Sequence, residues 1–224
     1  MSSIAIVGAG PGMGLAIART FGSRGFDVAL IARNRAKLDV LADRLGADGI
    51  TVAAFPADVL DHGALAQALK DADTRFGGID VLEYSPGGSL DSAPLTAPSA
   101  TSPSDVQWAM DVLLHGAIAA TQAVLPGMRE AGTGTLLYTN GAGSIEPNPM
   151  LGNLNVAQAA LRNWALGLHQ ELADTGIQAA HIAIGAWIGT AAPPGMPSAP
   201  AEDIAPLYWD LYAHRDAPER IFTA

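Results

Sequence analysis

A run of glycines near the start of the chain is the clearest candidate for a chemical role. Residues 8–14 read Gly-Ala-Gly-Pro-Gly-Met-Gly; they follow an apolar stretch typical of a buried strand and precede a helical pattern. Glycines at such a turn let the backbone approach a pyrophosphate, which then meets the N–H groups and dipole of the helix N-terminus. The pattern therefore predicts a nucleotide-binding turn, and a purely structural glycine turn is the alternative. Its expected ligand contacts are Gly8, Gly10, Gly12, Met13 and Gly14.

The residues after the second expected strand distinguish NADP from NAD. An acidic residue there would accept hydrogen bonds from the ribose hydroxyls of NAD, but this chain has Arg33 and Asn34. A guanidinium group matches the 2′-phosphate of NADP, so NADP is the expected cofactor and NAD the less favoured one. A solvated Arg33 at a strand end is the alternative. After the third expected strand, Asp58 and Val59 could contact the adenine, although Asp58 could equally cap the next helix.

Alternating strands and helices must position these residues. We expect strands at 4–7, 26–32, 50–55, 79–84, 135–139, 177–184 and 220–223. Between them we expect helices from the glycine run to about residue 23 and at 35–45, 63–76, 104–131, 151–175 and 203–213. Near-continuous apolar strands that alternate with helices indicate parallel βαβ units. The expected fold is one α/β domain over residues 1–224, a doubly wound parallel sheet of the Rossmann type in three α/β/α layers.

Two long loops should overhang the carboxyl edge of this sheet, where doubly wound folds bind their ligands. Residues 85–103 and 187–200 are rich in Pro, Ala, Ser and Gly, and each segment follows an expected strand. We interpret them as a lid over a small-molecule substrate, with surface irregularity as the alternative. Trp187 and Met196 could line an apolar pocket or pack within their own loop.

The composition argues against several other functions. Twelve basic residues against 22 acidic ones give a net charge of −10, which would repel a nucleic acid. The chain has no cysteine, and its five histidines lack metal-ligand spacing, so no metal site is expected. No basic leader and no uninterrupted apolar stretch of about 18 residues are present, which predicts a cytoplasmic protein that does not span a membrane.

Over nearly its whole length the chain resembles the short-chain dehydrogenase/reductase family. The glycine run resembles the family's Thr-Gly-x-x-x-Gly-x-Gly motif with Val in place of Thr, and residues 57–59 match its adenine-site segment. Residues 125–128 and 134–137 match the end of its fourth helix and its fifth strand. Residues 84–87 stand where the family has Asn-Asn-Ala-Gly, and residues 184–190 where it has Pro-Gly-x-x-x-Thr. The resemblance implies further cofactor contacts at Ser85, Pro86, Gly87, Gly185 and Ile188.

The chain departs from the family at the positions that carry its chemistry. The family uses Tyr-x-x-x-Lys on its fifth helix, with a Ser on the preceding strand and an Asn on the fourth helix; the Tyr exchanges a proton with the substrate. In our alignment these four positions hold Leu154, Gln158, Gly141 and Leu113, in the order Tyr, Lys, Ser and Asn. No tyrosine in the chain has a lysine four residues later. The ordinary mechanism is therefore not expected.

Three residues could supply part of the missing chemistry. Gln158 could hold the ribose hydroxyls, Asn140 could polarise a carbonyl group, and His115 could act as a general acid. The alternatives are a turn role for Asn140 and a packing or interface role for His115. Tyr84 and Tyr138 are interpreted as core residues, and Asn153 and Asn155 are expected to point away from the site.

These observations predict an NADP-binding oxidoreductase with an unusual active site that reduces a carbonyl or related group of a small, apolar molecule. An inactive nucleotide-binding protein with a regulatory or structural role, and a non-redox isomerase or dehydratase, remain alternatives. The resemblance implies pairing of subunits through the two long helices, so a homo-oligomer, dimer or tetramer, is expected. Trp108, Met110, Leu114 and Trp164 are the residues expected to form that face.

Overall fold

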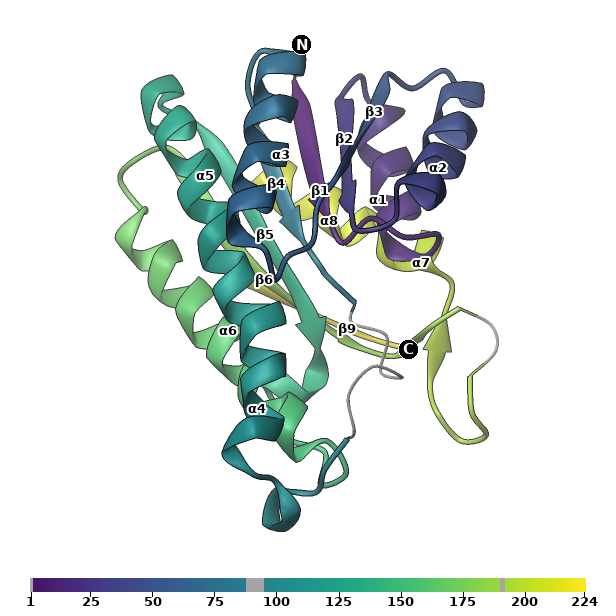
Figure 1. Cartoon of the computed structure of the whole chain (residues 1–224), viewed down its shortest axis with the longest axis vertical. Coiled ribbons are helices and arrows are strands. Elements are labelled where there is room, and N and C mark those ends of the chain that lie inside the picture. The colour runs from purple at the N-terminus through teal and green to yellow at the C-terminus, as the bar shows by residue number, and fades with distance from the viewer. Residues whose placement is uncertain (1, 88–94, 190–191) are drawn as a thin grey trace.

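The structure is a computed structural model that describes residues 2–87, 95–189 and 192–224. Within them the central sheet has seven strands, all parallel, in the order β3-β2-β1-β4-β5-β6-β9 (Figure 1). The strands are β1 (Ser3–Val7), β2 (Asp27–Ala32), β3 (Val52–Pro56), β4 (Val81–Tyr84), β5 (Gly134–Gly141), β6 (Ile177–Gly185) and β9 (Glu219–Thr223). The predicted doubly wound parallel sheet is confirmed.

Helices cover both faces of the sheet, which gives the three expected layers (Figure 1). One face carries α3 (His62–Phe76), α4 (Pro103–Met110), α5 (Gly116–Ala131) and α6 (Gly152–Glu171). The other carries α1 (Met13–Gly22), α2 (Arg35–Ala47), α7 (Ala201–Ile204) and α8 (Pro206–His214). Side chains of β1 alternate between the two faces: Ala5 and Val7 join the core on the α3 side, and Ile4 and Ile6 join the core on the α1 side.

Side-chain caps and glycines set several helix ends. Asp61 caps α3 by accepting from the backbone N–H of Ala64, and α3 ends at Gly77 with a φ of 76°. Ser102 and Asp105 form a capping box at the start of α4. The predicted end of α2 at residue 45 was too early, because Gly46 does not terminate the helix and α2 continues to Ala47.

Three other expectations about the elements need correction. The helix expected at 104–131 contains a π-helical turn, Asp111–His115, between α4 and α5. The helix expected at 203–213 is two helices, because Pro206 starts a new one. Two short parallel strands that were not expected, β7 (Trp187–Ile188) and β8 (Ser198–Ala199), pair within the loop expected at 187–200.

The segment Pro103–Ala131 is long and apolar enough to cross a membrane by composition alone, with a mean hydropathy of 1.3 over its most apolar stretch. In the fold it packs against the core, with Ala109, Ala117 and Val124 buried. It therefore has the surroundings of a core helix.

The strand order reverses its direction between β1 and β4. Chains of this fold bind ligands at such a point, outside the carboxyl ends of the strands. The glycine run follows β1 and residues 85–87 follow β4, so both segments lie at this edge.

Candidate functional site

A cavity of about 650 Å³ opens at the carboxyl edge of the sheet, beside β1 and β4. Its walls come from the turns after β1 and β4, the ends of β5 and β6, and helices α4 and α6. Most lining side chains are apolar, and no charged side chain lines the cavity within the described parts of the chain. The apolar lining residues are Leu95, Trp108, Ala109, Val112, Leu113, Leu151, Leu154, Ile184, Ala186 and Ile188.

The cavity gathers most of the predicted site residues. Those that line it are Gly8, Gly10, Gly12, Met13, Gly14, Ser85, Pro86, Gly87, Asn140, Gln158 and Ile188. The four positions aligned with the family's catalytic residues, Leu113, Gly141, Leu154 and Gln158, line it as well. The residues that do not line it are Arg33, Asn34, Asp58, Val59, His115 and Gly185.

Two glycines of the run have different reasons to be glycine. Gly8 has a φ of 98°, and a Cβ placed there would lie 2.5 Å from the backbone oxygen of Ser85. The fold itself therefore excludes a side chain at Gly8. A Cβ at Gly10 would meet nothing closer than the Gly8 oxygen at 3.8 Å. The fold leaves room at Gly10, on the cavity side of the turn.

The first turn of α1 lies beside this open space and has no side-chain cap. Gly12 is the N-cap residue, and its position supplies no side-chain hydrogen bond to the helix. Unpaired N–H groups and the positive end of the helix dipole favour a negatively charged ligand here. The turn therefore fits a pyrophosphate group.

The edge beside β2 carries Arg33. Gly8 and Ala9 donate their backbone N–H groups to the Ile31 oxygen at 2.9 and 3.0 Å, so the end of β2 adjoins the glycine run. Arg33 is exposed, and no ion pair or hydrogen bond of its guanidinium occurs within the described residues. By contrast Arg35 is bound to Asp39 at 2.8 Å. Arg33 is therefore available to an anionic group near the turn.

The side chains of Asn34 and Asp58 both accept hydrogen bonds from nearby backbone N–H groups. Asn34 caps α2 by accepting from the N–H of Lys37 at 3.0 Å. The Asp58 carboxylate accepts from the N–H of Leu60 at 3.1 Å. The alternative role of Asp58 as the cap of α3 is wrong, because Asp61 fills that position.

Asn140 is oriented by a chain of polar side chains behind the cavity wall. Its Nδ2 donates to the backbone oxygen of Gln158 at 3.0 Å, and its Oδ1 lies 2.9 Å from Nε2 of the fully buried His181. His181 Nδ1 lies 2.9 Å from Glu219, whose two oxygens accept from Arg162 at 2.6 and 2.9 Å. Nδ2 of Asn140 has a second hydrogen beyond the one given to Gln158. The amide is thus fixed in place and keeps a donor for a ligand.

The ionisable side chains in this hydrogen-bonded series shift one another's pKa values. The hydrogen bonds from Arg162 lower the pKa of Glu219. Burial lowers the pKa of His181, and its hydrogen bond with Glu219 opposes that shift. Because the Oδ1 atom of Asn140 can only accept, Nε2 of His181 is the donor in their contact.

Gln158 presents an unsatisfied acceptor. Its Oε1 atom is buried and has no hydrogen-bond partner in the described structure, although the residue lines the cavity. An unpartnered buried acceptor costs roughly 1–3 kcal/mol, so a ligand hydroxyl that donated to it would relieve that cost. This position fits a ribose hydroxyl.

A buried acid below the cavity was missed by our reading of the sequence. Glu83 lies in β4 with an exposed fraction of 0%. Its Oε2 atom lies 2.9 Å from Ser85 Oγ and its Oε1 atom lies 3.0 Å from Thr139 Oγ1, and both of these residues line the cavity. Burial raises the pKa of Glu83 to about 8. The signal that could have found it is a single acidic residue among the apolar residues of the strand segment 81–84.

The structure does not bring His115 to the cavity. His115 lies in the π-helical turn, and its Nδ1 is 2.8 Å from the carboxylate of Asp111. The expected roles of Tyr84 and Tyr138 in the core are confirmed, because both are fully buried. Tyr84 donates to the backbone oxygen of Val112, and Tyr138 shares a hydrogen bond with Thr121.

One expectation about the surroundings is wrong, and one of two alternatives is excluded. Asn153 does not point away from the site: it lines the cavity and accepts from the N–H of Thr96 at 3.2 Å. Trp187 and Met196 do not line it, and 41% and 46% of their surfaces are exposed. The apolar wall comes instead from α4, α6 and the ends of the strands. Thr190, the last residue of the resemblance to Pro-Gly-x-x-x-Thr, falls outside the described residues, as does part of the loop expected at 85–103.

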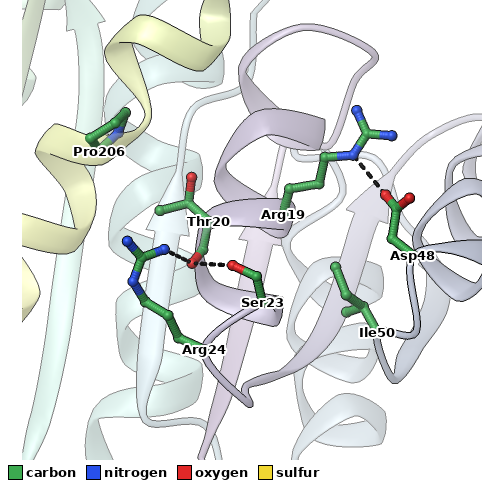
Figure 2. A pocket seen from close by; sticks show the side chains of 7 residues that line it. All are labelled: Arg19, Thr20, Ser23, Arg24, Asp48, Ile50 and Pro206. Atoms are coloured by element: carbon green, nitrogen blue, oxygen red, sulfur yellow. Dashed lines mark hydrogen bonds and ion pairs between the residues drawn. The ribbon is translucent and has the colours of Figure 1, made fainter.

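A second cavity of about 410 Å³ lies away from the glycine run, beside α1 and the start of α8 (Figure 2). Its arginines already have partners: Arg19 binds Asp48 at 2.8 Å, and Arg24 donates to the backbone oxygen of Thr20 and stacks on Trp209. Figure 2 shows the contact of Arg19 with Asp48 and the hydrogen bonds that Arg24 and Ser23 donate to the Thr20 oxygen. The larger cavity is therefore the candidate functional site.

The chain is similar to known proteins both in sequence and in fold. Residues 2–193 match the family described as short chain dehydrogenase. A fatty acyl-CoA reductase of Mycobacterium tuberculosis is 30% identical over 224 residues, which cover 97% of this chain and 75% of that protein. L-Sorbose reductase from Gluconobacter frateurii, complexed with NADPH and L-sorbose, has a TM-score of 0.88 at 21% identity, covering 99% of this chain and 95% of that one. An alcohol dehydrogenase from Thermococcus sibiricus, complexed with 5-hydroxy-NADP, has a TM-score of 0.84 at 24% identity, covering 100% and 96%. The chain belongs to the short chain dehydrogenase family.

Proposed function

We propose that the protein is an NADP(H)-dependent oxidoreductase that reduces a carbonyl group on an apolar small molecule. The observation that carries the proposal is the room at Gly10. The fold requires glycine at Gly8 but leaves open space at Gly10, at the uncapped first turn of α1. A turn that keeps such space on its cavity side is suited to the close approach of a pyrophosphate.

The remaining contacts extend this ligand across the cavity. Arg33 would hold the 2′-phosphate of NADP, and Gln158 Oε1 would accept from a ribose hydroxyl. Bound NADPH would supply the hydride. The solved relatives in complex with NADPH and with 5-hydroxy-NADP support this choice of cofactor.

The polar groups around the reacting carbonyl would differ from those of the family. Leu154 and Gln158 occupy the positions aligned with its Tyr and Lys, and the chain's two lysines, Lys37 and Lys70, belong to α2 and α3. A Leu side chain cannot exchange a proton, so another group must assist the reaction. The free hydrogen on Nδ2 of Asn140 would polarise the carbonyl oxygen, because the contacts with Gln158 and His181 hold the amide in place.

The walls of the cavity favour an apolar substrate. Trp108, Val112 and Leu154 line it. Within the described residues, no charged side chain lines the cavity that could bind a charged group of a substrate. A similar relative, the fatty acyl-CoA reductase, acts on a substrate with an apolar chain. We therefore infer an aliphatic or aromatic aldehyde or ketone as the substrate class.

The test is NADPH consumption with matched carbonyl compounds. The protein is mixed with NADPH and either decanal, decan-2-one or the polar ketose L-sorbose, and loss of the reduced nicotinamide absorbance is followed. We expect consumption with the apolar compounds and none with L-sorbose. Tight NADPH binding without consumption in any mixture would contradict the reductase function and favour an inactive nucleotide-binding protein.

A further inference from the structure

The buried acid below the cavity has surroundings that keep a proton on it. Glu83 is flanked in the sheet by Ile6 of β1 and Leu137 of β5. The titratable group that faces it from another element is Tyr208 of α8, which shares a hydrogen bond of 2.9 Å with Thr139. No basic side chain forms an ion pair with Glu83 in the described parts of the chain. An ionised carboxylate without a cation is costly in such a place, so the neutral acid is favoured.

Two hydroxyl groups connect this acid to the cavity, and they differ in the number of their hydrogen-bond partners. Thr139 Oγ1 contacts both Glu83 and Tyr208. Ser85 Oγ has Glu83 as its partner and is only partly buried. A hydroxyl can accept one hydrogen while it donates its own, so Ser85 can contact Glu83 and a ligand oxygen at once.

We propose that Glu83 is the proton donor of this site and acts through the Ser85 hydroxyl. The inference rests on the proposed reductase function. It supplies the proton that the family's Tyr would give and that Leu154 cannot. Ser85 would touch the reacting oxygen, and Glu83 would act from behind the Ser85 hydroxyl.

The step balances in atoms and charge. As a hydride reaches the carbonyl carbon, the carbon–oxygen π bond breaks and its electron pair moves to the oxygen. That oxygen takes the hydrogen of Ser85 Oγ, and Oγ takes the hydrogen of Glu83 Oε2. The substrate becomes an alcohol, NADPH becomes NADP⁺, Ser85 is again a neutral hydroxyl and Glu83 is a carboxylate. After the product leaves, water in the cavity returns a proton by the same route.

The first test asks whether Glu83 holds a proton, and it needs no activity. Infrared spectra are taken from about pH 5 to about pH 10, a range that spans ordinary and raised carboxyl pKa values. The wild type should show a protonated carboxyl band that persists at neutral pH and disappears with a midpoint near pH 8. The band should be absent in Glu83→Gln and retained in Glu146→Gln, which makes the same change at an exposed glutamate. A wild type without this band at neutral pH would overturn the inference.

The second test asks whether the proton is delivered. In single-turnover reduction of decanal by NADPH, Glu83→Gln and Ser85→Ala should each lower the rate by at least about 100-fold, within the range of general acid catalysis. Ser85→Thr keeps the hydroxyl and should retain most of the rate. The wild-type rate should fall as the pH rises through 8, whereas the residual rate of Glu83→Gln should not follow this profile.

The outcomes separate the two proposals. A Glu83→Gln variant with the rate and pH profile of the wild type would overturn the role of Glu83 and leave the reductase function standing. A wild type that shows the carboxyl band but consumes no NADPH would contradict the reductase function, and delivery by Glu83 would fall with it. Equal NADPH dissociation constants for the wild type and Glu83→Gln would show that the loss of rate in Glu83→Gln lies in chemistry rather than in binding.

Discussion

Ser85 Oγ lies 2.9 Å from the carboxyl group of Glu83, so a fully buried acid contacts a residue of the cavity wall. This relationship predicts a pH-dependent stability. The folded protein keeps a proton on Glu83 up to about pH 8, whereas the unfolded chain loses it near the ordinary value of 4.5. The stability from this group is fully present below pH 4.5 and is lost as the pH rises through 8.

The measurement is urea unfolding of the wild type and Glu83→Gln at several pH values. Relative to Glu83→Gln, the wild-type free energy of unfolding should fall by on the order of 4 kcal/mol from pH 4.5 to pH 8. Parallel curves for the two proteins would show that Glu83 does not carry a raised pKa.

The two glycines of the turn should respond differently to alanine. Gly8→Ala should lower the free energy of unfolding by about 2 kcal/mol or more, because its φ is 98° and its Cβ would overlap the Ser85 oxygen. Gly10→Ala should change the free energy of unfolding by less than about 1 kcal/mol and still weaken NADPH binding at least tenfold. Denaturation and fluorescence titration measure the two effects. If Gly10→Ala bound NADPH as the wild type does, the pyrophosphate would not lie against this turn.

Gln158→Leu should separate stability from ligand binding. Its Oε1 has no partner within the described structure, so replacing it should leave the unfolding free energy unchanged or raise it. NADPH affinity should fall about tenfold, because the ribose hydroxyl loses its acceptor. Gln170→Leu, an exposed position on the same helix, is the control. A loss of stability with no change in affinity would mean that Gln158 serves the fold.

Arg162 should matter more than a surface arginine of similar geometry. Arg162→Met removes two charge-assisted hydrogen bonds to Glu219, which is 19% exposed, and should cost about 1.5–3 kcal/mol of unfolding free energy. Arg220→Met removes a similar pair with Asp216, which is 54% exposed, and should cost no more than about 1 kcal/mol.

The stability that the Arg162–Glu219 pair contributes depends on pH in the opposite direction to the stability from Glu83. Arg162 lowers the pKa of Glu219, so the stability from Glu219 is present above the ordinary carboxyl range and is lost as the pH falls through its lowered value. Equal losses of unfolding free energy for Arg162→Met and Arg220→Met at neutral pH would contradict a special role for the hydrogen-bonded side chains behind Asn140.

The sequence predicted the sheet because its signals are local. Apolar runs, glycine turns and helical periodicity lie within short windows, and their alternation indicated the parallel topology. The break at Pro206 was missed because the apolar pattern continues across it, and β7 and β8 were missed because two-residue strands carry no periodicity.

The candidate site was predicted only in part because its connections are distant in sequence. The glycine run and Gln158 were found from motif spacing. The contact of Asn140 with His181 joins residues 41 positions apart, and that of Glu83 with Thr139 joins residues 56 apart. Neither separation has a spacing rule, because the register of β4, β5 and β6 creates both.

The most direct measurement is a fluorescence titration of the protein with NADPH and with NADH. Arg33→Ala is compared with Arg35→Ala, whose arginine is already paired with Asp39. The wild type should bind NADPH more tightly than NADH. Arg33→Ala should lose at least about tenfold in NADPH affinity with little change for NADH, since a charged hydrogen bond to phosphate is worth more than about 1.4 kcal/mol, while Arg35→Ala should behave as the wild type. Failure of the wild type to bind either nucleotide would contradict the account.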